Sequence, residues 1–133
     1  PLTFSPQNVT SLKNAWVTIT LENTKERGYL SDATAILATA NRVTIGSGHI
    51  YWLKLASGFI DAYLDPYGGE KLYEMFACTV AQAAGCTVTN REGVEFDATH
   101  YLKEFEANQN FIYYPVAARS KDLHQEILAA LKN

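Results

Sequence analysis

The chain has 133 residues, of which 47% are hydrophobic and 19% are charged, and its formal net charge is −3. These values predict a single globular domain, residues 1–133, that buries roughly two thirds of its unfolded surface, and they exclude a disordered chain. The small negative charge gives no basic surface for nucleic acid or anionic lipid, and the most apolar stretch, residues 75–88, is too short to span a membrane.

The two cysteines are expected to be buried, reduced thiols. Cys78 lies on a predicted helix and Cys86 enters a predicted strand, and a domain with this much core needs no disulfide. This favours a cytoplasmic protein. Residues 1–20 lack the basic start and apolar run of a signal peptide. Residues 1–6 carry no helix cap or turn signal, so we expect the chain to be cut from a longer one.

Strand-like and helix-like segments alternate along the first half of the chain. Residues 15–21 (AWVTITL) alternate apolar and polar side chains and predict a strand, and residues 30–40 predict a helix. The β-branched run 42–45 predicts a second strand, which ends at Gly46-Ser47-Gly48. Residues 49–59 form the next predicted helix. Apolar side chains surround most of its circumference, so we expect it to be packed on most sides.

The alternation continues in the second half. Residues 60–64 predict a strand, 65–69 a turn, and 71–84 a helix with Leu72, Met75, Phe76, Val80 and Ala83 expected on its core face. The later segments are a strand at 86–90, a turn at 90–93, a strand at 94–96, an ambiguous polar segment at 100–110, a strand at 111–117 whose Pro115 indicates a sheet edge or a strand end, and a helix at 121–132. This pattern predicts an α/β fold, with a mixed or largely parallel β-sheet flanked by helices.

Gly46-Ser47-Gly48 lies where a predicted strand meets a predicted helix. Backbone N–H groups at such a helix start can bind a phosphate or a sugar hydroxyl. The same residues also suit a tight turn whose glycines only allow close packing, and the motif alone leaves both interpretations open. It is not a P-loop, which needs Gly-Lys-Ser/Thr, and it is not a nucleophile elbow, because the glycine required two residues before Ser47 is Ile45.

Asp65, Glu70 and Glu74 cluster around one predicted turn and the helix that follows it. Their carboxylates could bind Mg²⁺ or sugar hydroxyls, but acidic residues also favour the first turns of helices because of the helix dipole. None of the three histidines has a partner at metal-ligand spacing, so we expect no zinc site. Two of them, His100 and His124, are expected at the surface.

Four motifs in order resemble the inositol monophosphatase family. Residues 45–48 (IGSG) and 56–63 (ASGFIDAY) resemble the family's Gly-Ser/Thr-Ala turn and its helix ending in Ala-x-Gly-x-x-Asp-Ala-Tyr. Residues 83–96 (AAGCTVTNREGVEF) resemble its Glu-Ala-Gly-Gly-x-Val-Thr-Asp-x-x-Gly-x-Pro-Phe segment, and residues 116–128 resemble its closing strand and helix. The resemblance covers almost the whole chain and is strongest over 43–96. It implies the C-terminal α/β half of a Mg²⁺-dependent sugar-phosphate phosphatase fold.

Site roles follow from this resemblance. The Gly46-Ser47-Gly48 turn would orient a small phosphorylated substrate, and Asp65 or Glu70 would contact its hydroxyls. Glu74 aligns with a family aspartate that binds a metal, but its extra methylene shifts the carboxylate by about 1.5 Å, which matters for the strict geometry of Mg²⁺. In the family the N-terminal half supplies most metal ligands, including an Asp-Pro-x-Asp-Gly-Thr loop that this chain lacks. No catalytic residue is therefore assigned here, and the chain alone is expected to be inactive.

A function of a different class stays open. The chain could be a degenerate, non-catalytic relative that binds a ligand or serves protein assembly, which Glu74 and a two-residue expansion of the acidic turn favour. A cut across this fold should also expose an apolar surface that faces the missing N-terminal half, so dimerisation through that surface is a further prediction. The family spans inositol phosphates, fructose bisphosphate and nucleotide-like phosphates, and the motifs do not choose among them.

Overall fold

The computed structural model describes residues 9–20, 30–65 and 72–131, and it describes no side chains for residues 30–32 and 72–74. Within these residues, five strands form one sheet in the order β2-β1-β3-β5-β4, so β2 and β4 are its edges. The strands are β1 (Trp16–Ile19), β2 (Arg42–Ile45), β3 (Ala62–Leu64), β4 (Thr87–Asn90) and β5 (Pro115–Ala118). β2, β1 and β3 are parallel, while β5 runs antiparallel to both β3 and β4. The predicted α/β class with a mixed sheet is confirmed.

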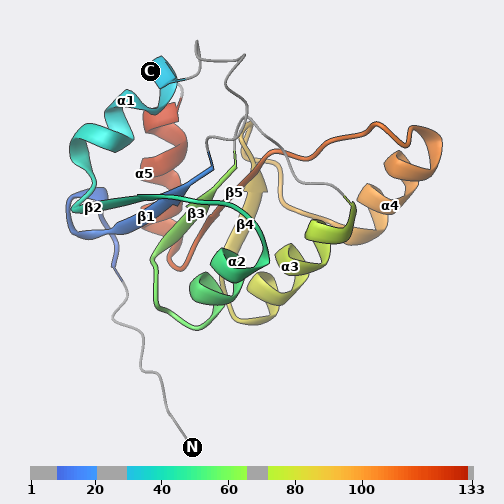
Figure 1. Cartoon of the computed structure of the whole chain (residues 1–133), viewed down its shortest axis with the longest axis horizontal. Coiled ribbons are helices and arrows are strands. Elements are labelled where there is room, and N and C mark those ends of the chain that lie inside the picture. Colours follow the sequence, from blue (N-terminus) through green and yellow to red (C-terminus); the bar gives the residue numbers. More distant parts are fainter. Residues whose placement is uncertain (1–8, 21–29, 66–71, 132–133) are drawn as a thin grey trace, which may run out of the picture.

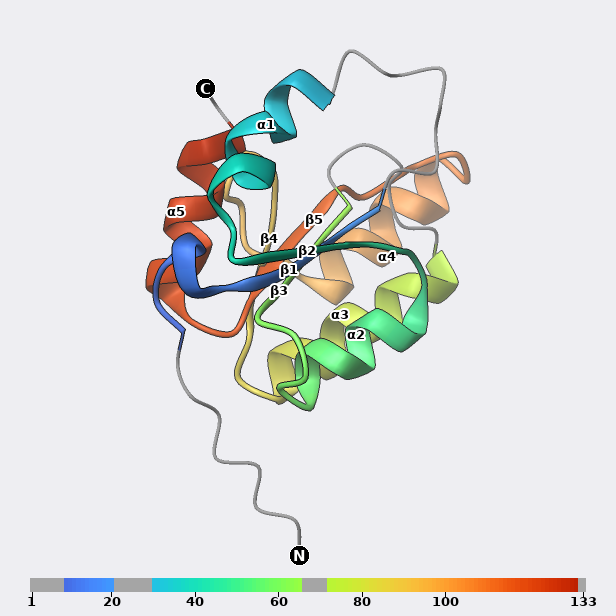
Figure 2. The same ribbon diagram turned by 60° about the vertical axis from the view of Figure 1, so that its left-hand side comes forward.

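Helices cover both faces of the sheet (Figures 1 and 2). On one face lie the short η1 (Leu12–Asn14), α1 (Leu30–Thr39) and α5 (Lys121–Leu131), and on the other lie α2 (His49–Ala56), α3 (Leu72–Ala83) and α4 (Ala98–Ala107). None of the helices in the described part of the chain is long and apolar enough to cross a membrane.

The central strand β1 is buried on both faces. Val17 and Ile19 belong to the apolar cluster beneath α1 and α5, where they pack with Leu123 and Ile127 of α5. Side chains alternate along a strand, so Thr18 points to the other face, and it too is fully buried. The alternation in residues 15–21 therefore marks an interior strand whose polar side is also covered.

α3 turns a different face to the core from the one that we predicted. Met75 is buried as expected, and Cys78 and Ala81 are fully buried beside it. The outward side carries Phe76 (64% exposed), Val80 (49%) and Ala83. α3 has apolar residues on both sides, and its core side combines Met75 with the small residues Ala77, Cys78 and Ala81, which allow α3 to approach its neighbours closely.

The prediction that the helix at 49–59 is packed on most sides is also wrong. Trp52 and Leu55 are buried, but Ile50 and Leu53 on the opposite side are each 55% exposed. α2 is shorter than predicted as well, because it ends at Ala56 with Ser57 as its C-cap.

Three later segments refine the sequence interpretation. Pro115 begins β5, where a missing N–H group is tolerated, but β5 is an interior strand and not a sheet edge. The ambiguous polar segment is α4, and the Asp97 side chain caps it by accepting two backbone N–H groups of its first turn, at 2.8 and 3.2 Å. The predicted strand at 94–96 is only a single bridge between Thr89 and Glu95.

Both cysteines are free and buried, as predicted. Burial raises the pKa of the Cys86 thiol above its ordinary value, while the nearby Arg119 guanidinium acts in the opposite direction. A thiol with a raised pKa stays protonated at neutral pH and is a poor nucleophile. We therefore regard Cys86 as a core residue.

His124 is buried, so the expectation of a surface histidine is wrong. Its Nε2 lies 2.9 Å from Thr89 Oγ1, and the Thr89 hydroxyl donates its only hydrogen to the Asn90 carbonyl at 2.7 Å, so Nε2 is the donor. Nδ1 has no hydrogen-bond partner among the described residues. Burial lowers the pKa of His124, although the nearby Val116 backbone acts in the opposite direction.

Stability should therefore fall at mildly acidic pH. Because the unfolded chain binds the His124 proton more tightly than the folded state, the free energy of unfolding should decrease as the pH drops below about 6.5 toward the lower folded pKa. Urea unfolding at a series of pH values measures this slope. His124→Gln should reduce the slope, whereas Gln125→Asn, at the exposed neighbouring position, changes no titrating group and should leave it unchanged. Equal slopes in the wild type and the His124 variant would contradict the prediction.

Candidate functional site

β1, β2 and β3 are parallel, so their carboxyl ends lie along the same side of the sheet, across the strands (Figure 1). This row of strand ends is the edge referred to below, and it is distinct from the edge strands β2 and β4. The chain passes from β1 to β2 through α1 on one face, and from β2 to β3 through α2 on the other face, so that β3 lies on the opposite side of β1. The connections thus diverge between β1 and β3, and open α/β sheets bind ligands outside the carboxyl ends of the strands at such switch points. The candidate site is therefore formed by Thr20, Gly46-Ser47-Gly48 and Asp65, which follow these strands.

Thr20 connects the three strand ends. Its amide donates to the Leu64 carbonyl (2.9 Å), and its hydroxyl donates to the Gly46 carbonyl (3.1 Å). The Tyr63 hydroxyl lies 2.9 Å from Thr20 Oγ1, and it must be the donor because the only hydroxyl hydrogen of Thr20 is directed to Gly46. Thr20 and Tyr63 are both buried, so this small network is shielded from water and fixes the distance between the strand ends.

The Gly46-Ser47-Gly48 turn leads directly into α2. Gly48 is the N-cap residue and has a φ of 89°, a conformation that favours glycine. Its carbonyl accepts the Tyr51 amide at 3.1 Å. At Gly46 a Cβ atom would overlap the ring of Tyr51, so this position has no room for a side chain. Backbone conformation at Gly48 and packing at Gly46 thus explain why these residues are glycines. A bound ligand is favoured instead by the position of the turn at the switch point.

Asp65 follows β3 and is only 4% exposed. Its amide donates to the Pro115 carbonyl at 2.9 Å, and the preceding residue, Leu64, accepts the Thr20 amide, so Asp65 lies next to Thr20. A buried carboxylate is stable only when hydrogen-bond donors surround it. The structure thus brings Asp65 and the Gly46-Ser47-Gly48 turn to the same edge of the sheet, on either side of Thr20.

The structure does not locate the side chains of the other two acidic residues that we predicted for the site. Glu70 lies outside the described residues, and Glu74 lies in the first turn of α3, where the structure describes the backbone but not the side chain. Among the described side chains, no three His, Cys, Asp or Glu residues are grouped so that they could hold a metal ion. The substrate role of Glu70 and the metal role of Glu74 stay predictions.

Sequence reasoning missed three residues at this edge: Thr20, Tyr51 and Tyr63. The Tyr51 and Tyr63 rings are stacked with their centroids 6.2 Å apart, and Trp52 meets Tyr63 edge-on at 4.8 Å, so α2 holds the Tyr63 hydroxyl in place. One signal was available for Thr20, because it stands near the end of the first predicted strand, and strand ends of parallel sheets are where ligands bind. No signal in the sequence pairs Tyr63 with it.

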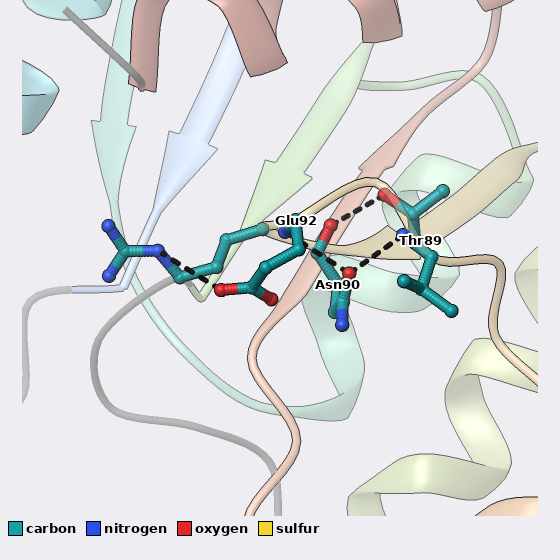
Figure 3. A network of polar contacts seen from close by, with 5 residues as sticks. Thr89, Asn90 and Glu92 are labelled. Carbon is teal, nitrogen blue, oxygen red and sulfur yellow. Dashed lines mark hydrogen bonds and ion pairs between the residues drawn. The ribbon is translucent and has the colours of Figure 1, made fainter.

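A separate polar turn closes the end of β4 (Figure 3). The Asn90 side chain accepts the amides of Glu92 (3.1 Å) and Val94 (2.8 Å), and the Thr89 hydroxyl donates to the Asn90 carbonyl. Arg91 and Glu92 form a loose ion pair of 3.9 Å near the surface, which contributes little to stability. These contacts lie within the turn itself, so the predicted turn is confirmed and we assign it no ligand.

No protein-family model and no curated protein matches this chain. Solved structures do match it. An inositol monophosphatase from Zymomonas mobilis and the extragenic suppressor protein SuhB from Bartonella henselae each give a TM-score of 0.75 at 16% identity, and the match covers 96% of this chain and 46% of theirs. SaIMPase-II with inositol monophosphate bound gives a TM-score of 0.70 at 16% identity, with the same coverage.

The chain therefore has the fold of inositol monophosphatases over less than half of their length. This agrees with the half-molecule that the sequence motifs implied. At 16% identity the likeness is one of fold, and the chemistry of the site has to be argued from its residues.

The Thr20–Tyr63 network should contribute measurably to stability. Thr20→Val leaves the Gly46 carbonyl and the Tyr63 hydroxyl without their partner, and should lower the free energy of unfolding by about 1–3 kcal/mol. Tyr63→Phe should cost less, and the double variant should cost less than the sum of the two. Urea unfolding measures all three, with Thr39→Val at an exposed position of α1 as the control. Strict additivity would show that the two hydroxyls do not interact.

The contact between Gly46 and Tyr51 gives a second prediction. Gly46→Ala forces a methyl group against the Tyr51 ring and should destabilise the chain by about 1–3 kcal/mol. In a Tyr51→Ala background the same glycine substitution should cost much less, because the ring is gone. Thermal or urea unfolding of the four proteins checks this. An equal cost of Gly46→Ala in both backgrounds would contradict it.

Proposed function

We propose that this chain is the substrate-binding half of a Mg²⁺-dependent phosphomonoesterase of the inositol monophosphatase type, which acts on a sugar or inositol phosphate. The observation that carries the proposal is the meeting of the Gly46-Ser47-Gly48 turn and the buried Asp65 at the β1/β3 switch point. A helix start that suits an anion and a carboxylate that suits hydroxyl groups are the two features that a sugar phosphate needs.

In this proposal each group has one task. The Gly46-Ser47-Gly48 turn directs the N-terminus of α2 toward the phosphate and so helps to orient it, because a helix N-terminus carries partial positive charge. Asp65, or Glu70 in the following segment, accepts hydrogen bonds from the hydroxyls of the ring. Thr20 is a positioning residue, since its hydroxyl is bonded to Gly46 and its amide to the residue before Asp65.

We propose that the metal site forms only in the complete fold. Glu74, at the start of α3, is the residue of this chain that we propose as a ligand, and carboxylate oxygens are the donors that Mg²⁺ prefers. The remaining ligands are proposed to come from an N-terminal half, because the chain spans less than half of the structures it matches. When bound, Mg²⁺ would activate a water for attack on phosphorus and stabilise the leaving oxygen.

A non-catalytic relative that binds a ligand or serves assembly is the second candidate. The observation that favours it is Glu74, because the resemblance implies aspartate at this position and a longer side chain would displace the metal. An intact Asp-Pro-x-Asp-Gly-Thr segment encoded upstream would support the enzyme, and an eroded segment would support the binder.

Compartment and first substrate are also proposals. Two buried thiols that form no disulfide suit a reducing compartment, and we propose the cytoplasm. Inositol monophosphate is the first substrate to test, because SaIMPase-II, which shares this fold, has been solved with it bound.

The isolated chain should not hydrolyse inositol or sugar phosphates in the presence of Mg²⁺. Release of inorganic phosphate measures this, with a complete inositol monophosphatase as the positive control. Hydrolysis by the 133 residues alone would overturn the assignment of most metal ligands to a second half.

In the complete protein, Asp65→Asn should lower kcat/KM by about 10- to 100-fold, the range expected for the loss of one or two charge-assisted hydrogen bonds to substrate. Asp122→Asn, at an exposed position in the first turn of α5, is the matched control and should leave kcat/KM unchanged. Steady-state phosphate release gives both values. An unchanged kcat/KM for Asp65→Asn would remove Asp65 from the proposed site.

A further inference from the structure

The phenol group of Tyr51 lies against the Gly46-Ser47-Gly48 turn. β2 ends at this turn and α2 begins directly after it (Figure 1), and Tyr51 is in the first turn of α2. Side chains of an α-helix tilt toward its N-terminus, so Tyr51 can reach back over the chain that precedes the helix. Its Cζ, Cε2 and hydroxyl oxygen are the atoms that a Cβ on Gly46 would meet. The Tyr51 hydroxyl therefore lies at the turn itself.

The Tyr51 ring is held in this position by its neighbours. It stacks on the Tyr63 ring with 7° between the ring planes and 6.2 Å between the centroids. The Lys54 ammonium lies 4.7 Å from the centroid of the Tyr51 ring, and the Tyr51 amide donates to the Gly48 carbonyl at 3.1 Å. A side chain that is already ordered has little conformational entropy left to lose when a ligand binds. The Tyr51 hydroxyl is thus a preorganised polar group.

The two stacked tyrosines use their hydroxyls differently. The Tyr63 hydroxyl lies 2.9 Å from Thr20 Oγ1, and both of these residues are buried. No hydrogen bond joins the Tyr51 hydroxyl to another residue in the described part of the chain, and Tyr51 is only half-buried. Because a phenol O–H can both donate and accept, Tyr51 offers the turn an unused hydrogen-bonding group.

The Tyr51 hydroxyl also differs from the unpartnered hydroxyls of the core. Thr18 and Tyr113 carry hydroxyls that have no partner among the described residues, but both oxygens are sealed from solvent. Thr18 lies in the middle of β1, and the Tyr113 ring packs edge-on against Phe96 and Tyr101. The Tyr51 oxygen is not one of these sealed atoms, so a ligand at the turn can reach it.

We propose that Tyr51 is a substrate-contacting residue, whose hydroxyl forms a hydrogen bond with the substrate oxygen that lies against the Gly46-Ser47-Gly48 turn. This inference rests on the proposed function and deepens it, because it adds a side chain to the turn. The partner is a phosphate oxygen or a sugar hydroxyl, both of which a phenol can bind. Asp65 lies on the other side of Thr20, so Tyr51 and Asp65 contact different parts of the substrate.

The test compares Tyr51→Phe with the wild type in the complete protein. Phenylalanine keeps the ring that stacks on Tyr63 and removes only the hydroxyl. Calorimetric titration in the presence of Mg²⁺ gives the Kd of inorganic phosphate, and phosphate release from inositol monophosphate gives kcat and KM. If inositol monophosphate is bound but not hydrolysed, it is titrated in the same way as phosphate.

Two results would support the proposal and would identify the oxygen. If Tyr51 contacts the phosphate, Tyr51→Phe should raise the Kd of inorganic phosphate by about tenfold or more, as expected for the loss of a hydrogen bond to a charged group. If it contacts a sugar hydroxyl, the Kd of phosphate should stay unchanged, and the KM or Kd of inositol monophosphate should rise by about 2- to 10-fold, as for a neutral hydrogen bond.

Tyr113→Phe is the matched control, because it removes a phenol hydroxyl that has no partner among the described residues and is sealed in the core. It should leave the Kd and KM values unchanged. Urea unfolding checks that both variants are folded. Tyr51→Phe should keep the wild-type midpoint, since no hydrogen bond within the described chain is lost, whereas a structural role of the hydroxyl would lower the midpoint and contradict the proposal.

The outcomes separate this inference from the proposed function. Unchanged Kd and KM values in Tyr51→Phe, with kcat/KM still lowered in Asp65→Asn, would overturn the role of Tyr51 and leave the proposed function standing. Equal losses in Tyr51→Phe and Tyr113→Phe would also overturn it. Weaker binding by Tyr51→Phe in a protein that hydrolyses nothing would support Tyr51 and count against the phosphatase. A wild type that binds neither compound would overturn both proposals.

Discussion

The burial of β1 between two parallel neighbours is the constraint on which the candidate site depends. β1 is hydrogen-bonded to β2 on one edge and to β3 on the other, and both of its faces are covered by helices. Thr20, the residue that follows β1, therefore cannot shift without moving both neighbouring strands. The Gly46-Ser47-Gly48 turn and Asp65 come from distant parts of the sequence, and it is the fixed position of Thr20 that holds them at the same edge.

The tight core around this edge leaves little freedom for substitution. The Tyr63 hydroxyl reaches Thr20 only because its ring is held between the aromatic rings of α2, and Gly46 must lack a side chain because the ring of Tyr51 occupies the space. The aromatic residues at the start of α2 thus act on the site through packing. They connect the apolar helix layer to the polar strand ends.

Much of the fold could be predicted from the sequence because its signals are local. β-branched runs and alternation located the strands, and β2 was predicted with its observed bounds. It was harder to predict from the sequence which face of each helix points to the core. α3 has apolar residues on both sides, with Met75 and Ala81 inward and Phe76 and Val80 outward, and periodicity cannot tell which side meets the sheet. His124 was misjudged for a similar reason, since its partner Thr89 lies on a strand far away in sequence.

The candidate site was predictable only in part. Gly46-Ser47-Gly48 and Asp65 were identified from their places beside predicted strands and helices, the motif resemblance added their roles, and the structure brings them to one edge of the sheet. Thr20 and Tyr63 were missed because their importance comes from strand order, which places β1 between β2 and β3. Strand order is a long-range property, and no spacing within the sequence specifies it.

β2, as an open edge of the sheet, has a consequence for how this chain behaves at high concentration. The other edge, β4, carries the bridge from Thr89 to Glu95, which partly covers it. β2 is only four residues long, and the guanidinium of Arg42, its first residue, lies 3.9 Å from the centroid of the Trp16 ring on β1. A short edge strand with a fixed positive charge is a poor template for strands of other molecules. The sheet therefore resists amyloid-like growth from this edge, even though α2 and α3 leave an apolar surface exposed.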